Sequence, residues 1–140
     1  MRLDKLTIKS QEAVAEAVHQ AEETGHPQAE PLHLLAALLE QPEGIVRSIL
    51  KKLGADLPRL DQETAKGLEQ LPQVSGAHQV PLGQETQTVI ETASKTAGDM
   101  HDDYVSVEHL LMALAVVPSK AAEILTGAGA TPEVILKALV

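Results

Sequence analysis

The sequence predicts an all-α fold built from two similar four-helix units, and three observations support this prediction. The chain of 140 residues repeats its own pattern at a fixed distance. Its apolar residues recur at helical spacing between recognisable start and stop residues, and no stretch alternates apolar and polar residues over the length of a strand. Hydrophobic residues make up 44% of the chain while Phe, Trp and Cys are absent, so the core must consist of Leu, Ile, Val, Ala and Met.

The repeat is clearest when the sequence is shifted by 76 positions, because ten identical residues then align between positions 6 and 42. Composition alone would give about three. The aligned identities are Leu6/Leu82, Gln11/Gln87, Ala17/Ala93, Ala21/Ala97, His33/His109, Leu34/Leu110, Leu35/Leu111, Ala37/Ala113, Leu38/Leu114 and Pro42/Pro118. Further on the shift becomes 75, where Gly54-Ala55 matches Gly129-Ala130. Each half is too small to bury its apolar stripes alone, so we expect the halves to pack about a pseudo-twofold axis with a seam between them.

The repeat also defines the domain organisation. We expect a single domain over residues 1–140, with the first repeat at about 1–70, a connector at about 71–81 and the second repeat at about 82–140. The connector contains two prolines, one glycine and several small polar residues, which interrupt any helical period. It therefore separates the two four-helix units.

Four helices are expected in the first repeat, each from a local signal. Thr7 is a good N-cap for the first helix and Gly25 ends it. Pro31 opens the second helix, since proline is favoured in a first helical turn. The third helix is expected within 44–53, and Asp56 caps the fourth.

The second repeat follows the same scheme. Gly83 takes the cap position that corresponds to Thr7, Ser106 caps the next helix, and Thr131-Pro132 opens the last one. The segment Tyr104–Val107 is the nearest approach to a strand, but it is short and runs into a helix. We therefore expect eight helices and interpret this segment as an extended turn.

Composition and missing motifs exclude several classes of function. The formal net charge of −9 opposes binding to nucleic-acid phosphates, and no segment has the roughly 20 apolar residues of a membrane-spanning helix or the apolar core of a signal peptide. The absence of a Gly-Lys pair excludes a P-loop, and no Gly-x-Ser-x-Gly elbow is present. The lack of cysteine excludes thiolate chemistry and fits a reducing cytosol. We expect no nucleic-acid partner, no membrane partner and no catalytic site in this chain.

One pattern suggests a metal ligand pair, because Glu30 and His33 have the Glu-x-x-His spacing of carboxylate-bridged metal centres. In the second repeat, however, Ser106 replaces the carboxylate before His109. We therefore expect no metal, and interpret His33 and His109 as packing or capping residues. The remaining histidine patterns are read as a polar loop at His101-Asp102-Asp103 and as surface or loop residues at His19, His26 and His78.

A duplicated helical unit has a cleft along its seam, which the residues at the starts of the paired helices are expected to line. These are Leu6, Thr7, Ile8 and Gln11 in one half and Gln87, Val89 and Ile90 in the other. A groove with an apolar floor and a polar rim binds extended or helical peptides. Spacing equally allows the alternative that these side chains are ordinary core.

Several segments resemble the Clp amino-terminal double-repeat family. They are the opening residues 1–7, the Glu-Pro-Leu-His-Leu-Leu segment at 30–35, the segment 68–76 with its Leu-Pro-Gln-Val-Ser-Gly sequence, and the Tyr-Val-Ser-Val-Glu-His-Leu-Leu segment at 104–111. The resemblance spans nearly the whole chain. Within the family, the opening residues and the connector are most similar to the ClpB branch.

This resemblance implies a function. ClpB proteins are cytoplasmic, ring-forming AAA+ disaggregases of the stress response, usually homohexamers, which extract polypeptides from aggregates with the DnaK chaperone system. The resemblance implies that ATPase modules lie downstream and that ATP and Mg bind only there, so this domain has no cofactor and is a monomer by itself. By similarity, three polar positions correspond to Thr7, Asp102 and Glu108, which frame a groove for unfolded polypeptide.

The sequence therefore predicts a non-enzymatic domain that binds unfolded or aggregated polypeptide. The predicted binding residues are Thr7, Ile8, Gln11, Gln87, Ile90, Asp102 and Glu108. One alternative is a domain that docks a specific adaptor in a protease-associated unfoldase. A second alternative is a metal-dependent hydrolase that uses Glu30 and His33.

Overall fold

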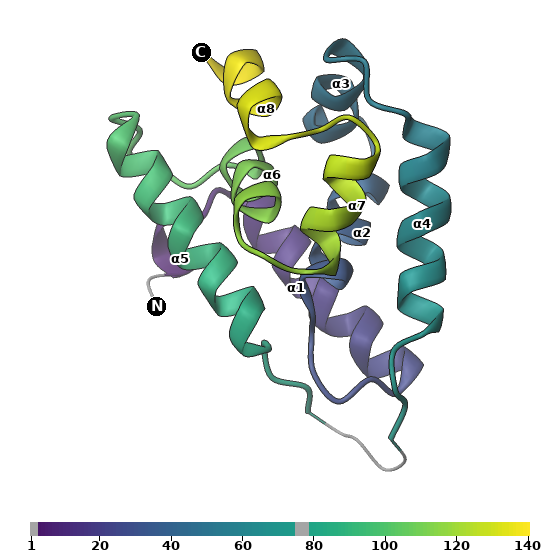
Figure 1. Ribbon diagram of the computed structural model, residues 1–140. Coiled ribbons are helices and arrows are strands. Elements are labelled where there is room, and N and C mark those ends of the chain that lie inside the picture. The colour runs from purple at the N-terminus through teal and green to yellow at the C-terminus, as the bar shows by residue number, and fades with distance from the viewer. Residues whose placement is uncertain (1–2, 75–78) are drawn as a thin grey trace.

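The computed structural model describes residues 3–74 and 79–140, and within these ranges it is all-helical apart from isolated bridges (Figure 1). A short 3-10 helix, η1, spans Leu3–Lys5. The α-helices are α1 (Ile8–Thr24), α2 (Pro31–Glu40), α3 (Ile45–Lys52), α4 (Leu57–Glu69), α5 (Gln84–Asp99), α6 (Val107–Val116), α7 (Lys120–Gly127) and α8 (Pro132–Leu139). This confirms the predicted eight-helix fold. The part of the connector at 75–78, which includes His78, lies outside the described residues.

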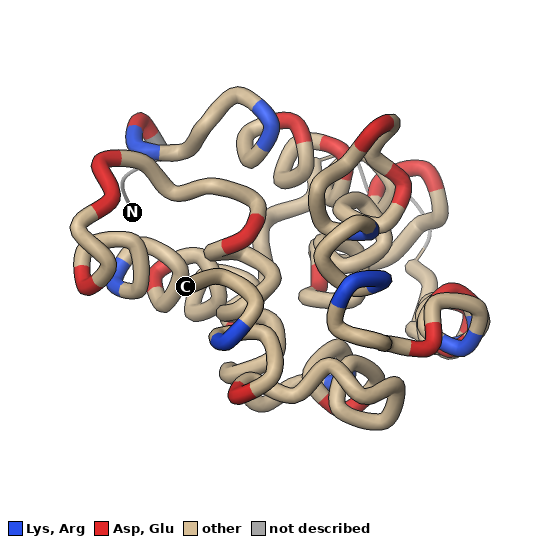
Figure 2. Tube along the Cα trace, turned by 90° about the horizontal axis from the view of Figure 1, so that it is seen from above, with Lys and Arg blue, Asp and Glu red and all other residues tan. Residues whose placement is uncertain are grey.

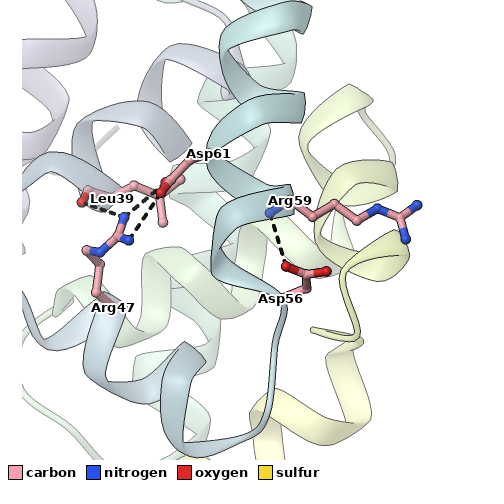
Figure 3. Close-up of polar contacts among 5 residues, drawn as sticks. All are labelled: Leu39, Arg47, Asp56, Arg59 and Asp61. Atoms are coloured by element: carbon pink, nitrogen blue, oxygen red, sulfur yellow. Dashed lines mark hydrogen bonds and ion pairs between the residues drawn. The ribbon is translucent and has the colours of Figure 1, made fainter.

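The helices begin where the sequence signals predict. Thr7 Oγ1 accepts a hydrogen bond from the Ser10 amide at 3.2 Å, and Asp56 Oδ1 accepts one from the Arg59 amide at 3.1 Å (Figure 3). Thr131 caps α8 in the same way, at 3.4 Å from the Val134 amide. Each cap satisfies a backbone donor that the first helical turn leaves unpaired.

The two most apolar helices, α2 and α6, lie at the centre of the molecule. Every residue of α2 from Pro31 to Leu39 is buried, and most of α6 is buried as well. The other helices pack around them, with α4 and α5 on opposite edges (Figure 1). The repeated His-Leu-Leu segments are thus the inner faces of the core, where each buried leucine contributes about 2 kcal/mol.

Gly67 in α4 lies where this helix packs tightly on α2 of its own repeat and meets α7 of the other. A Cβ atom at this position would lie 2.9 Å from Leu32 Cδ1 in α2 and 3.8 Å from Ile124 Cδ1 in α7. Since real Cβ atoms do not approach other atoms as closely as the first of these distances, only glycine fits without movement of Leu32. The side chains of both repeats belong to one continuous hydrophobic core.

An ion pair joins α3 to α4 within the first repeat (Figure 3). The Arg47 guanidinium donates to both carboxylate oxygens of Asp61, at 3.0 and 3.2 Å, and also to the Leu39 carbonyl at 3.4 Å. The hydrogen bond to Asp61 raises the pKa of Arg47. Both side chains are partly exposed, so this pair orders the α3–α4 arrangement more than it stabilises the fold.

Acidic side chains dominate the charged surface. Figure 2 shows Asp and Glu spread around the periphery of the molecule, with fewer Lys and Arg among them. Within residues 3–74 and 79–140, no single helix has both the length and the apolar content to cross a membrane. Taken together, α6 and α7 reach that length and apolar content, but they are bent by 96° at the break between them.

Candidate functional site

Two short backbone pairings join the repeats to each other. In the first junction, Lys5–Thr7 pairs with Val105: the Thr7 amide donates to the Val105 carbonyl at 3.0 Å and the Val105 amide donates to the Lys5 carbonyl at 2.8 Å. In the second junction, Pro81–Gly83 pairs with Ala29: the Ala29 amide donates to the Pro81 carbonyl at 2.9 Å and the Gly83 amide donates to the Ala29 carbonyl at 3.0 Å. The two junctions occupy equivalent positions of the two repeats, so the structure confirms the duplication.

Side chains at the two junctions repeat the same contacts. Ser10 Oγ donates to the Val105 carbonyl at 2.9 Å, and Thr86 Oγ1 donates to the Ala29 carbonyl at 2.7 Å. Two glutamines also correspond, because Gln11 Nε2 donates to the Leu6 carbonyl at 3.0 Å and Gln87 Nε2 donates to the Leu82 carbonyl at 3.1 Å. The amide groups of both glutamines therefore hold the starts of α1 and α5 in place.

The histidines that begin α2 and α6 are capping residues, as predicted. His33 Nδ1 accepts from the Glu30 amide at 2.8 Å, and His109 Nδ1 accepts from the Ser106 amide at 2.9 Å. Their second ring nitrogens have different partners: His33 Nε2 lies 2.8 Å from His26 Nδ1, whereas His109 Nε2 lies 2.9 Å from Asp102 Oδ2.

His26 is a loop residue, which is one of the two positions predicted for it, but it is not at the surface. It lies in the turn between α1 and α2, and its side chain is buried, with only 4% exposed. The reason is that His33 needs a buried hydrogen-bond partner, and His26 occupies the position that Asp102 takes in the second repeat. His19, by contrast, is exposed and pairs with Glu23.

The metal alternative for Glu30 and His33 finds no support in this arrangement. Both ring nitrogens of His33 already have hydrogen-bond partners, as the preceding contacts show. In the part of the chain that the structure describes, no three His, Asp or Glu side chains gather as metal ligands would. The predicted polar loop at His101-Asp102-Asp103 is exposed throughout.

The first junction carries an apolar surface. A hollow of about 250 Å³ is lined by Leu6, Gln11, Val14 and Ala15. Beside it in the sequence, Ile8 is 73% exposed, and Tyr104, next to Val105, is 56% exposed. The Lys5 ammonium lies 5.9 Å from the centre of the Tyr104 ring, so a cation–π contact links the two paired segments.

Five of the seven predicted binding residues belong to this first junction. Thr7, Ile8 and Gln11 come from its first segment and the start of α1, while Asp102 and Glu108 lie three residues to either side of Val105. Thr7 is half-buried, and its hydroxyl also donates to Ser10 Oγ at 3.0 Å. Asp102 is exposed and Glu108 is half-buried, which places negative charge on the segment that pairs with Leu6.

The other two predicted residues belong to the second junction, where the surface differs. Gln87 is half-buried, and the expectation that Ile90 lines an open groove is wrong, because Ile90 is only 2% exposed and is part of the core. Val89, proposed for the same groove, is also fully buried. The positions equivalent to Ile8 and Tyr104 are Gln84 and Gln28, so this junction lacks exposed large apolar side chains at these positions.

Sequence reasoning overlooked Tyr104, Val14 and Ala15 as parts of this surface. Comparing the repeats residue by residue would have flagged Tyr104, since the equivalent residue is Gln28. Val14 and Ala15 give no such signal, because an exposed and a buried apolar residue look alike at the same helical spacing.

Comparisons with known proteins agree with this architecture. The family model described as the Clp repeat (R) N-terminal domain matches residues 5–139. The chaperone protein ClpB of Rhodopirellula baltica is 38% identical over 138 residues, which cover 99% of this chain and 16% of that protein. The chain thus spans about a sixth of the length of this curated relative.

Solved structures share the fold. The Hsp104 N-terminal domain of Candida albicans superposes with a TM-score of 0.84 at 21% identity, covering 96% of this chain and 88% of the other. A complex of a ClpV N-domain with a VipB peptide superposes with a TM-score of 0.73 at 19% identity, covering 96% and 89%. With two repeats of the same four-helix unit and a family match along nearly its whole length, the chain belongs to the Clp repeat (R) N-terminal domain family.

Proposed function

We propose that this domain recognises unfolded or aggregated polypeptide at the first junction, as the substrate-binding part of a ClpB-type, ATP-dependent disaggregase. The observation that carries the proposal is the asymmetry between the junctions. Ile8 and Tyr104, each next in sequence to a residue of the first junction, expose large apolar side chains, and Leu6 of this junction lines an apolar hollow. The second junction has Gln84 and Gln28 in place of Ile8 and Tyr104. An apolar surface of this kind suits extended or helical peptide segments.

Polar residues complete the proposed site. Thr7, Asp102 and Glu108 would form its rim, and Gln11 would hold the floor through its bond to the Leu6 carbonyl. Carboxylates beside an apolar surface orient a bound chain and disfavour acidic segments, while the apolar contacts supply most of the affinity. Gln87 and Ile90 are not included, because they lie at the second junction.

The proposed role in a larger protein explains why a shallow site suffices. Binding to one domain should be weak, because the free energy lost in ordering a flexible chain offsets most of the gain from a small number of contacts. Several domains on a ring raise the effective concentration of binding sites. We propose that the parent is a cytoplasmic homohexamer that binds ATP and Mg in its other domains and works with the DnaK system, in keeping with the greater length of its ClpB relative.

The test is an amide NMR titration of the domain with a permanently unfolded protein. Resonances around Thr7, Gln11 and Tyr104 should move. The double variant Ile8→Gln with Tyr104→Gln gives the first junction the residues of the second and should weaken binding about tenfold, a loss of about 1.4 kcal/mol. Ile45→Gln, which removes another exposed isoleucine from the start of α3, is the matched control and should bind like the wild type.

A second candidate function is docking of one specific adaptor at the same junction. It is favoured by the ClpV N-domain that shares this fold and is complexed with a VipB peptide. If the domain recognises substrates, unrelated unfolded chains should all shift the same resonances. If it docks an adaptor, these chains should cause no shifts, and one partner should form a one-to-one complex. Shifts confined to another face, or full binding by the double variant, would contradict the site proposed here.

A further inference from the structure

The hydrogen bonds around the His26–His33 pair fix the positions of its protons. The Glu30 amide donates to His33 Nδ1 at 2.8 Å, so neutral His33 carries its proton on Nε2. That proton points to His26 Nδ1, 2.8 Å away, which must accept it. Thr24 Oγ1 also lies 3.0 Å from this nitrogen. The Thr24 hydroxyl donates its proton to the Gln20 carbonyl at 2.7 Å, so it does not compete with His33 as a donor to His26. His26 therefore carries its own proton on Nε2.

An added proton does not fit this arrangement. A proton on His26 Nδ1 would face the Nε2–H of His33 and break the bond between the rings, with Thr24 Oγ1 at 3.0 Å left as its acceptor. A proton on His33 Nδ1 would face the amide of Glu30. His26 is 4% exposed and His33 is 1% exposed, so water cannot replace the lost partners without movement of the turn. Burial is the main reason that the pKa of His33 is lowered from 6.5 to about 4, and the charge of His26 lowers it further.

The pair closes the turn on which the second junction depends. This turn runs from Gly25 to Ala29, between α1 and α2. The Gly25 carbonyl accepts from the Val74 amide at 2.8 Å, and the Gln73 side chain donates to the Thr24 carbonyl at 3.0 Å. Ala29 makes the backbone pairing with Pro81–Gly83. Opening the turn would therefore release both the start of the connector and the second junction.

The first junction has a different pair at the equivalent place. Asp102 Oδ2 lies 2.9 Å from His109 Nε2, and a carboxylate accepts a proton from this nitrogen whether His109 is neutral or charged. Protonated His109 would gain an attractive charge partner in Asp102. Acid thus destabilises the pair at the second junction more than the pair at the first.

Other titratable groups are few around the His26–His33 pair. At the helix ends nearest this turn, the charged side chains are those of Glu22, Glu23, Glu30, Lys66, Glu69 and Glu85. All are exposed except Glu30, whose carboxylate accepts from the Gln28 side chain at 2.8 Å. Among the described residues, only His26 shifts the pKa of His33 through its charge.

From this geometry we propose that the His26–His33 pair is an acid-sensitive latch: as the pH falls, the second junction opens locally while the first junction stays closed. The sign follows from the direction of the shift. In the closed turn His33 resists protonation, because burial lowers its pKa, whereas in the opened turn its pKa returns to the ordinary value near 6.5. The contribution of neutral His33 to the stability of the closed turn is complete above pH 6.5 and is lost as the pH falls towards about 4.

The test compares amide hydrogen-exchange protection at the two junctions of the wild-type domain between pH 7 and pH 5. We compare protection factors because they remove the intrinsic effect of pH on exchange. The lowered pKa of His33 by itself should reduce them about 20-fold at Ala29 and Gly83. They should change far less at Thr7 and Val105. Equal changes at both junctions, or none at Ala29 and Gly83, would overturn the proposal without any variant being needed.

The repeat provides two variants in which a residue is replaced by its equivalent from the other repeat. His26→Asp copies the second repeat into the first, and should reduce the acid-induced loss at Ala29 and Gly83 to a few-fold. Asp102→His makes the reverse exchange, and should transfer acid sensitivity to Val105. If His26→Asp retains the 20-fold loss while folding normally, the histidine pair is not the latch.

Discussion

At the scale of single residues, burial decides which of two equivalent side chains can act at a surface. Val14 and Ile90 occupy the same position in the two repeats, yet Val14 lines the hollow at the first junction and Ile90 is core. The sequence could predict that both positions are apolar, but not which one the neighbouring helices cover. The same limit applies to His26, whose burial depends on a partner seven residues away.

Ile90→Glu should unfold the domain. A glutamate at this position would place an uncompensated charge in the core, at a cost of several kcal/mol. Circular dichroism at 25 °C should show loss of most helical signal. Val14→Glu, at the equivalent half-buried position, is the control and should stay folded while weakening peptide binding. A folded Ile90→Glu variant would mean that this side chain can reach solvent.

At the scale of helices, the sequence predicted most of what the structure contains. Caps such as Thr7, Asp56 and Thr131 are local signals, so the starts of α1, α4 and α8 were foreseeable. The junctions were not, because they pair residues far apart in the chain through only two backbone bonds each. So short a pairing produces no periodic pattern in the sequence. The segment Tyr104–Val107 was therefore predicted only as an extended turn.

Asp56→Ala tests how much one cap contributes. Removing the carboxylate that accepts from the Arg59 amide should lower the free energy of unfolding by about 1 kcal/mol, because α4 loses its only side-chain cap. Urea unfolding followed by circular dichroism measures this change. Gln62→Ala, at an exposed position in the same helix, should leave stability nearly unchanged. Equal effects from both changes would argue against capping as the cause.

At the scale of the whole molecule, the two repeats share one core. Side chains from both repeats form a continuous cluster, and α4 of the first repeat packs against α7 of the second at Gly67. Neither repeat therefore has a complete core of its own. The sequence predicted this dependence from the size of each half, and the structure adds the residues through which it acts.

Global unfolding should accordingly be a single transition. Tyr104 is the only aromatic residue, so its fluorescence reports on the first junction, while circular dichroism at 222 nm reports on all helices. Urea unfolding curves from the two signals, recorded at pH 7.5, should coincide. An earlier fluorescence midpoint would show that the repeats separate before they unfold, contrary to a shared core.

The crossed arrangement of the two junctions has a consequence for the origin of the fold. Each repeat lends its opening segment to the turn between the first two helices of the other repeat, as Leu6 pairs with Val105 and Leu82 with Ala29. This is the geometry of a symmetric dimer whose subunits exchange arms. Two separate copies of an ancestral half could have closed both contacts in this way, and gene fusion would then have tied the partners together and freed their equivalent surfaces to diverge.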